Sequence, residues 1–380
     1  MKILFWLSLG VLVYTYFGYP FLMYILVKFK KRKGVDKRKI TPMVSVVVSA
    51  YNEEASIRDK LENILSLEYP REKMEVIIAS DASTDKTDEI VGEFLSEGVK
   101  LLRMQKRSGK IAAYRQALSQ AKGEIIVFSD ATSILNKESL INLVSNFNDK
   151  TVGCAGGLLM YINPEKANVG EGESKYWEYE KLVRKLESRL SSLTSVSGTL
   201  YAVRRELYPY GIKDDLADDL IVPINIKKLG FKTVLETEAV CKEFTTFDIR
   251  GDMAKRSRIT IQNIRGLINQ IGILNPLRYG IFSILVISHK LFRTIVPVLL
   301  LVVFLSSAIL SFNSLVFLTI FVLQIIFYLV GFLGYLGINK LKSKIINMMF
   351  YFCLSNLAIL IGIIKFFKGE KVVSWEPIRS

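Results

Sequence analysis

The chain has long apolar segments at both ends and a mixed segment between them. Four apolar runs with almost no charges approach or exceed the ~18 residues needed to cross a bilayer. These runs are residues 1–27, 294–311, 315–338 and 345–367. Charged and apolar positions mix between residues 28 and 293. The pattern predicts a water-soluble domain between membrane helices, and the mean hydropathy of +0.30 agrees with it.

The mixed segment repeats a strand followed by a helix. Short runs rich in Val and Ile occur in "MVSVVVSAYNE", "MEVIIASDASTD" and "EIIVFSDA". Helical spacing of apolar residues appears at Ile57, Leu61 and Ile64, from about Lys86 to Leu95, and in "IAAYRQALSQA". Because apolar strands that alternate with helices are typical of α/β folds, the sequence predicts a parallel sheet covered on both faces.

Polar residues close three of these strands, in "SAYNE", "SDASTD" and "SDAT". In open α/β sheets, ligands bind outside the carboxyl ends of the strands. A single Asp at such a position is commonly only a helix cap. Three polar strand ends that meet at one edge predict a binding site.

The basic charge has a membrane explanation. The formal net charge is +15, and "KFKKRKGVDKRK" (residues 28–39) directly follows the first apolar run. Lys and Arg beside a span mark the cytoplasmic side, and each gains about 1 kcal/mol near anionic lipids. The first run is too long for a signal peptide and lacks a cleavage site, so an anchor is predicted. Nucleic acid is not expected as a partner, because no binding motif accompanies the charge.

The cysteine and histidine content excludes several kinds of site and mechanism. Three cysteines without a CxxC pair argue against a disulfide framework or a zinc site. The single histidine, His289, excludes His-rich metal sites and most Ser-His-Asp mechanisms, so carboxylates must do any acid–base work. The run "GCAGGLL" lacks GxGxxG spacing, which argues against a dinucleotide-binding dehydrogenase.

The ordered motifs resemble the family-2 glycosyltransferases, membrane-associated enzymes that include polysaccharide synthases. The resemblance runs through "VSVVVSAYNEE", "SDASTDKT", "RSGKIAAYRQAL", "FSDATSI", "VSGTLYAVRREL" and "DDLADDLIVPINIKKLGFK" to the membrane segments. It implies a GT-A fold, the Rossmann-like fold of nucleotide-diphospho-sugar transferases. It also implies a nucleotide-diphosphate sugar as donor, with a UDP-sugar favoured.

The resemblance assigns the donor side of the site. It gives Tyr51, Glu53 and Asp81 to the nucleotide, and Lys110 as a basic contact. Asp130 matches the first acid of the family's DxD motif, which holds a divalent cation, Mg²⁺ or Mn²⁺. A hard cation accepts one or two carboxylates plus substrate phosphates. The chain departs from the motif at position 132, where Thr132 is a weaker candidate ligand than an acid.

The acidic run "KDDLADDL" carries the candidate base. Asp214 and Asp218, and Asp215 and Asp219, are spaced to share one face of a helix that runs toward Leu229. They could equally be an acidic helix start favoured by the dipole. The resemblance makes Asp219 the general base and Asp218 the neighbour whose charge raises its pKa. Asp215 is the alternative if the register is shifted by one turn.

The acceptor side is also assigned by resemblance. Processive members carry QxxRW where this chain has "KRSRI": Arg258 matches the Arg, and with Arg256 suits a departing diphosphate. Lys255 and Ile259 replace the Gln and the Trp, which argues against processive synthesis. The family's acceptor-side loop corresponds to Ser197, Gly198 and Thr199.

These patterns predict an anchor (1–29), a GT-A domain (40–250), interfacial helices (251–293) and a C-terminal membrane region (294–380). We expect a multi-pass enzyme of the cell membrane with a cytoplasmic catalytic domain. It would invert the sugar configuration on transfer to a lipid-linked or growing glycan acceptor. Single-sugar transfer to a lipid and an inactive export scaffold are the alternatives. A transporter is disfavoured because the spans carry almost no ionisable residues. Because three later spans would place the basic tail outside, one of the last segments is expected not to cross.

Overall fold

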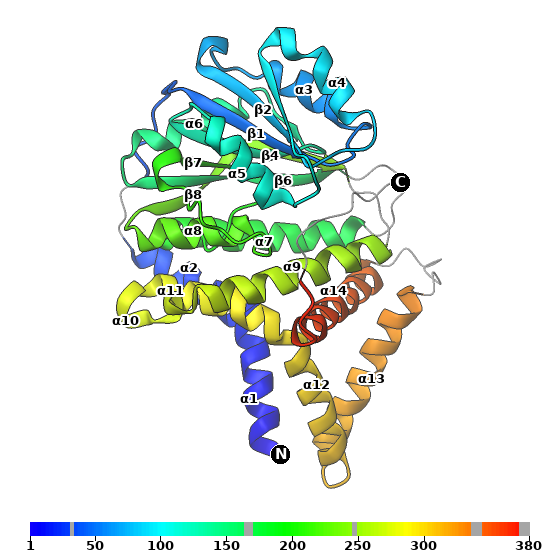
Figure 1. Ribbon diagram of the computed structural model, residues 1–380. Helices are drawn as coiled ribbons and strands as arrows, with labels where there is room; N and C mark the ends of the chain where they lie inside the picture. The colour runs from blue at the N-terminus through cyan, green and yellow to red at the C-terminus, as the bar shows by residue number, and fades with distance from the viewer. Residues whose placement is uncertain (31–33, 163–169, 245–248, 336–343, 372–380) are drawn as a thin grey trace.

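The computed structural model describes residues 1–30, 34–162, 170–244, 249–335 and 344–371. An α/β domain lies above a group of apolar helices, and α7 and α9 run between the two parts (Figure 1). The predicted basic cluster falls partly outside the described residues, at 31–33, and so does the predicted tail from 372 onward.

One eight-stranded sheet forms the centre of the domain, in the order β3-β2-β1-β4-β7-β6-β8-β5. The strands are β1 Val44–Ala50, β2 Met74–Ser80, β3 Val99–Arg103, β4 Ile125–Asp130, β5 Ile134–Leu135, β6 Val152–Ile162, β7 Leu200–Arg204 and β8 Lys232–Phe244. Strands β3, β2, β1 and β4 are parallel, whereas β7 is antiparallel to both β4 and β6. Strands β6 and β8 are parallel to each other, and β5 is antiparallel to β8, so the prediction of a parallel sheet is wrong for β7 and β5. Strand β7 is buried along nearly its whole length, so its apolar run does not reveal its direction.

Helices cover both faces of the sheet, as predicted. They are α3 Ile57–Leu65, α4 Thr87–Glu93, α5 Lys110–Gln120, α6 Ser139–Ser145 and α8 Asp218–Lys228. Helices α3, α4 and α6 share one hydrophobic core with the sheet, and α5 and α8 share the other. Each helix buries an apolar stripe, so the edge of the sheet and its loops remain for chemistry.

Among the described residues, four helices are long and apolar enough to cross a membrane: Lys2–Phe29, Ile281–Ser311, Leu315–Tyr335 and Ile345–Phe367. The first joins α1 Lys2–Val13 and α2 Tyr19–Phe29 through a π-helical turn, Tyr14–Gly18. The second joins α11 Ile281–Val286 and α12 Phe292–Ser311 through another, Ile287–Leu291. The others are α13 Leu315–Tyr335 and α14 Lys344–Phe367, and the remaining helices are α7 Gly170–Leu190, α9 Ile249–Asn269 and α10 Pro276–Tyr279.

The helix Ile281–Ser311 corrects the predicted boundary at residues 293/294. Backbone hydrogen bonding continues through that point, so part of the region expected to be separate interfacial helices belongs to this helix. The sequence changes polarity there without a helix-breaking residue. The longer helix therefore carries His289, Lys290 and Arg293, although the spans were expected to hold almost no ionisable groups.

Helix α14 packs along α9 rather than standing apart from it. A Cβ at Gly362 would lie 2.8 Å from the carbonyl oxygen of Ser257, so only glycine permits this approach. Near the end of α14, Arg265 of α9 donates to the carbonyl oxygen of Glu370 at 3.0 Å. Arg265 also pairs with Asp215 of the α/β domain at 3.0 Å. The end of α14 thus lies on the side of the helices that faces the domain.

Candidate active site

The three polar strand ends meet at one edge of the sheet. In the strand register, Ala50 is paired with Ser80, and Ser49 with Asp130. Tyr51, Asp81 and Asp130 therefore lie in neighbouring loops. The backbone is strained beside them, because Asn52 (φ 53°) and Ala82 (φ 59°) adopt left-handed conformations without being glycines. Such strain persists only where surrounding contacts fix it, and it is common at functional sites.

Asp81 shapes the loop that leads to Lys110. Its carboxylate is fully buried and accepts backbone hydrogen bonds from Ser108 (2.7 Å) and Gly109 (2.8 Å). Gly109 has φ 91°, a conformation that favours glycine, and it directly precedes α5. Asp81 thereby sets the position of the first residue of α5, which is Lys110.

The other two residues predicted to bind the nucleotide lie on the first loop. The guanidinium of Arg107 stacks on the ring of Tyr51, 3.8 Å from its centroid. Glu53 accepts from the Ser56 hydroxyl at 2.8 Å, and its backbone N–H donates to Thr87 at 2.7 Å. Burial raises the pKa of Glu53, and the negative charge of Asp130 adds to the effect. The loop therefore presents a flat aromatic surface beside a carboxylate.

Lys110 and Asp130 form an ion pair at the centre of the predicted donor side. Their ion pair measures 2.6 Å, and both side chains remain partly exposed. The ammonium also approaches the carbonyl oxygen of Gly198, at 3.5 Å. Burial disfavours the charged ammonium, but Asp130, Tyr114 and Asp218 together outweigh it and raise the pKa of Lys110 well above its ordinary value. Lys110 thus links the strand-end acid to the predicted acceptor-side loop.

That loop is tied to β4. The hydroxyls of Ser197 and Thr199 are 2.7 Å apart, and the Thr199 carbonyl accepts from the Ser129 hydroxyl at 2.9 Å. The backbone N–H of Val196 donates to the carbonyl of Asp219 at 2.9 Å. Backbone contacts therefore connect the acceptor-side loop with both acid-bearing segments.

Asp218 and Asp219 open helix α8, but Asp214 and Asp215 lie before it. The predicted i and i+4 pairs on one helical face are therefore wrong. The helix begins only after Ala217, which has extended backbone angles. Asp214 instead pairs with Arg115 at 2.7 Å, and Asp215 with Arg265. The structure thus separates the two candidate base positions.

The environment of Asp219 suits a base. Burial raises the pKa of Asp219 to about 6, and the charge of Asp218 adds to it, while Lys290, Lys110 and Arg184 act in the opposite direction. Asp218 is held by a 2.6 Å hydrogen bond from the Tyr201 hydroxyl. A carboxylate that titrates near neutrality can take up a proton during a reaction.

The two arginines of "KRSRI" point to different surroundings. Arg258 is close enough to Asp130 and Asp219 for both charges to act on it, and its buried Nε has no hydrogen-bond partner among the described residues. Arg256 is not brought to this cluster, since it pairs with Asp252 at 2.7 Å and contacts Tyr351 of α14. Two residues along a helix differ by about 200° in direction, so both could not face one ligand.

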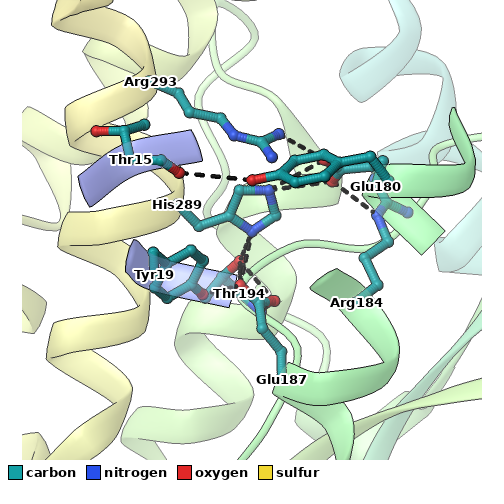
Figure 2. A network of polar contacts seen from close by, with 9 residues as sticks. Thr15, Tyr19, Glu180, Arg184, Glu187, Thr194, His289 and Arg293 are labelled. Carbon is teal, nitrogen blue, oxygen red and sulfur yellow. Dashed lines mark hydrogen bonds and ion pairs between the residues drawn. The ribbon is translucent and has the colours of Figure 1, made fainter. Parts of the chain in front are cut away.

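A buried polar network reaches Thr194, close in sequence to the predicted acceptor-side loop (Figure 2). His289 lies between Glu187 (2.6 Å) and Glu180 (3.0 Å). Glu187 also accepts from the Tyr19 hydroxyl at 2.8 Å and from the backbone N–H of Thr194 at 3.2 Å. The network thus joins the N-terminal helix, α7, the helix Ile281–Ser311 and the segment that leads to the acceptor-side loop.

Sequence reasoning missed several charged residues of this region. Lys60 is fully buried on α3 and donates to Ser129 (2.7 Å) and to the Ser133 carbonyl (2.7 Å), beneath Asp130. Glu243 approaches Thr132 from the end of β8. A lysine in the apolar stripe of α3 was a signal in the sequence, because charged residues are rarely buried without a partner. Glu243 had no such signal, since only the fold brings it near.

Comparisons with known proteins agree with this arrangement. Residues 45–210 match the family model described as glycosyl transferase family 2. A solved mannosyltransferase from Pyrobaculum calidifontis, in complex with GDP-Man and Mn²⁺, has a similar fold with a TM-score of 0.73. That likeness covers 97% of this chain and 100% of the other at 23% identity.

Curated relatives match the chain less completely. A probable glycosyltransferase, YdaM of Bacillus subtilis, is 28% identical over 60% of this chain and 58% of its own. The poly-beta-1,6-N-acetyl-D-glucosamine synthase of Staphylococcus epidermidis is 24% identical over 57% and 53%. The beta-monoglucosyldiacylglycerol synthase of Nostoc is 32% identical over 43% and 36%. The chain spans about half or less of the length of these relatives. The family match, the fold and these relatives together identify residues 45–210 as a domain of the glycosyl transferase family 2 type.

Proposed function

We propose that the chain transfers a sugar, with inversion, from a nucleotide-diphosphate sugar to a lipid-linked or growing glycan acceptor at the cytoplasmic membrane face. One observation carries the proposal: Arg258 lies within electrostatic range of both Asp130 and Asp219. A donor diphosphate at Asp130 and an acceptor hydroxyl at Asp219 would then both lie near one cation. Inverting transfer needs the leaving group and the attacking hydroxyl close together, because both act on the same anomeric carbon, from opposite faces.

The donor nucleotide is proposed to bind along the first two loops. Tyr51, with Arg107 stacked on its ring, offers an aromatic face for the base. Glu53 offers a carboxylate to hydroxyl groups. Asp81 positions Lys110 through the loop before α5, and Lys110 would contact the diphosphate. A UDP-sugar remains the favoured donor, and the GDP-Man complex of the similar mannosyltransferase makes GDP-sugars the next candidates.

A divalent cation, Mg²⁺ or Mn²⁺, is proposed at Asp130. The oxygens there, a carboxylate and the Thr132 hydroxyl, are the ligand type that hard cations prefer, so the residues fit such an ion. When bound, the ion would neutralise charge on the diphosphate as it leaves. Among the described residues, no three His, Cys, Asp or Glu side chains group as a metal site, so donor phosphates would complete the ligand set.

Asp219 is proposed as the general base. It removes the proton from the acceptor hydroxyl, whose oxygen then forms a bond to the anomeric carbon. The bond from that carbon to the diphosphate oxygen breaks, and the electron pair leaves with the nucleoside diphosphate. Lys110 and Arg258 are the cations placed to stabilise the departing charge. Asp218, fixed by Tyr201, keeps the pKa of Asp219 raised.

The acceptor is proposed to approach from the membrane. The acceptor-side loop rests on the network of Figure 2, which includes residues of two candidate spans. The relative that makes poly-beta-1,6-N-acetyl-D-glucosamine supports polymer extension, as its name states. The relative named beta-monoglucosyldiacylglycerol synthase, together with Ile259 in place of a Trp, supports single-sugar transfer to a lipid. Both acceptors place the chemistry beside the bilayer.

The helix arrangement supports a topology in which α14 does not cross. Three crossings, by Lys2–Phe29, Ile281–Ser311 and Leu315–Tyr335, return the chain to the side of the catalytic domain. The contact of Arg265 with Glu370 supports a position for the end of α14 on that side as well. The basic tail would then be cytoplasmic, as the positive-inside rule favours.

A donor screen tests the proposal. The full chain, purified in detergent with membrane lipid, is incubated with a panel of nucleotide sugars, and released nucleoside diphosphate is measured. We expect release with one donor, its loss in Asp219→Asn, and its loss on chelation of the metal. Release that is unchanged in Asp219→Asn would refute the assignment of the base, and full activity in excess chelator would refute the metal. No release with any donor would favour the inactive scaffold.

A further inference from the structure

Asp130, the predicted cation ligand, is not followed by a second acidic residue at position 132. Thr132 occupies that position and is exposed. A single carboxylate binds a divalent cation weakly, because affinity depends on the number of charged ligands. A second carboxylate nearby in space would serve as well as one nearby in sequence.

Strand β8 brings such a carboxylate to the site. Strands β5 and β8 pair antiparallel, with Ile134 opposite Lys242 and Leu135 opposite Cys241. This register places Glu243, near the end of β8, against the turn that follows Asp130. The Thr132 hydroxyl donates to Oε1 of Glu243 at 3.5 Å. Strand pairing therefore fixes Glu243 beside the acid.

Glu243 and Asp130 are close enough to repel each other electrostatically, and the positive charges of Lys255 and Lys110 act on Glu243 in the opposite direction. Glu243 is only partly exposed. Within the described residues it forms no ion pair, and the Thr132 hydroxyl is its one hydrogen-bond partner. Two neighbouring carboxylates with spare oxygen lone pairs are a favourable setting for a dication.

The turn itself is held from below. The buried ammonium of Lys60 donates to Ser129 and to both oxygens of Ser133, at 2.7 to 3.1 Å. The Ser133 hydroxyl donates in turn to the carbonyl of Asp130 at 2.8 Å. The turn between Asp130 and Ser133 is therefore anchored, so Asp130 and Thr132 face Glu243 in a fixed arrangement.

We propose that Glu243 supplies the second carboxylate of the divalent-cation site, in place of the acid that a DxD motif carries at position 132. The proposal rests on the proposed cation at Asp130 and deepens it. Thr132 acts as a positioning residue that orients Glu243. The ligand set is then Asp130, Glu243 and the donor diphosphate.

Direct metal binding tests this without relying on turnover. The full chain in detergent is titrated with Mn²⁺, and unbound Mn²⁺ is measured by electron paramagnetic resonance, with and without UDP or GDP. We expect Glu243→Gln to weaken Mn²⁺ binding by about tenfold or more. Glu238→Gln is the matched control, because it removes the same charge from an exposed position of the same strand. It should leave binding within about twofold of the unmodified chain.

A variant that moves the second carboxylate from position 243 to position 132 gives the decisive test. Thr132→Asp restores the motif at an exposed position, so it should tighten Mn²⁺ binding and should recover most of the loss when combined with Glu243→Gln. Melting curves show whether each variant is folded, and Thr132→Asp alone still tests the idea if Glu243→Gln is not. Weaker binding in Thr132→Asp, or no rescue in the folded double variant, would overturn the proposal.

The outcomes separate this inference from the function on which it rests. If Asp130→Asn abolishes Mn²⁺ binding while Glu243→Gln leaves it unchanged, the cation site stands and Glu243 is not part of it. If neither change affects binding, the cation at Asp130 fails as well. An equal loss in Glu238→Gln would show a general charge effect and would also overturn the role of Glu243.

Discussion

Replacing Asp219 by Asn should lower activity and raise stability in one step. A pKa that rises from 3.8 to about 6 corresponds to about 3 kcal/mol of disfavoured ionisation in the folded state. Asp219 keeps some exposure, so we expect about half of this, or ~1.5 kcal/mol, at neutral pH. That corresponds to a melting temperature higher by ~3 to 6 °C. The transfer rate should fall by about 10²- to 10⁴-fold, as for a lost general base.

The stability gained in Asp219→Asn depends on pH. Below pH 4 the Asp219 carboxyl is protonated in both states and has no effect. Between about pH 4 and 6 the unfolded chain loses this proton first, so the folded state binds more protons and its stability falls as the pH rises. Above pH 6 the penalty is complete. The gain in Asp219→Asn should therefore be present at pH 7.5 and shrink toward pH 4.5.

The assay pairs melting curves at these two pH values with transfer rates and donor affinity. Donor affinity should remain, because Asp81 and Lys110 are untouched. Asp214→Asn is the control, since its exposed pair with Arg115 contributes only about 0 to 1 kcal/mol. A less stable Asp219→Asn at pH 7.5 would refute the account of burial. Normal transfer in Asp219→Asn with loss in Asp215→Asn would move the base to Asp215.

Three further changes test other parts of the molecule. Asp218→Asn removes a charge that raises the pKa of Asp219, so the acidic limb of the pH–rate profile should move to lower pH, and an unmoved limb would contradict the coupling. Glu187→Gln breaks the buried pair with His289 and should lower the free energy of unfolding by about 3 kcal/mol or more. Thermal melting measures this against the exposed control Glu238→Gln, and equal melting temperatures would show that the network does not stabilise the fold. A cysteine at Glu370 should react with impermeant maleimide only in inside-out vesicles, whereas labelling from outside would mean that α14 crosses the membrane.

The first half of the sheet and its loops could be predicted because local pattern and function coincide there. Strands β1, β2 and β4 each bury an apolar run and end in polar residues, so Tyr51, Asp81 and Asp130 could be placed at one edge. The direction of β7 could not, because a buried antiparallel strand has the same apolar pattern as a parallel one.

Contacts between segments that are distant in the sequence were the other feature that could not be predicted. Arg256 and Arg258 look equivalent in the sequence, and only the packing of α14 on α9 shows that Arg256 is engaged with Asp252 and Tyr351. His289 looked like a lone histidine, and its two glutamates come from α7, about a hundred residues away. Helix spacing also suggested one face for Asp215 and Asp219, but the helix starts too late for that. Each error concerns a partner that no local pattern encodes.

As a membrane span, the long helix Ile281–Ser311 would make catalysis depend on the thickness of the bilayer. Its 31 residues extend for about 46 Å, whereas the hydrocarbon core measures about 30 Å. If the helix crosses the bilayer, the end that holds His289 and Lys290 lies on the side of Asp219 and would stand in the headgroup layer. A thicker or thinner bilayer would make such a helix tilt or shift, and the attached polar network would move with it. In vesicles of increasing acyl-chain length, we expect the transfer rate to pass through a maximum. The maximum should occur at the bilayer thickness for which the tilt of the helix keeps Asp219 correctly positioned relative to the donor.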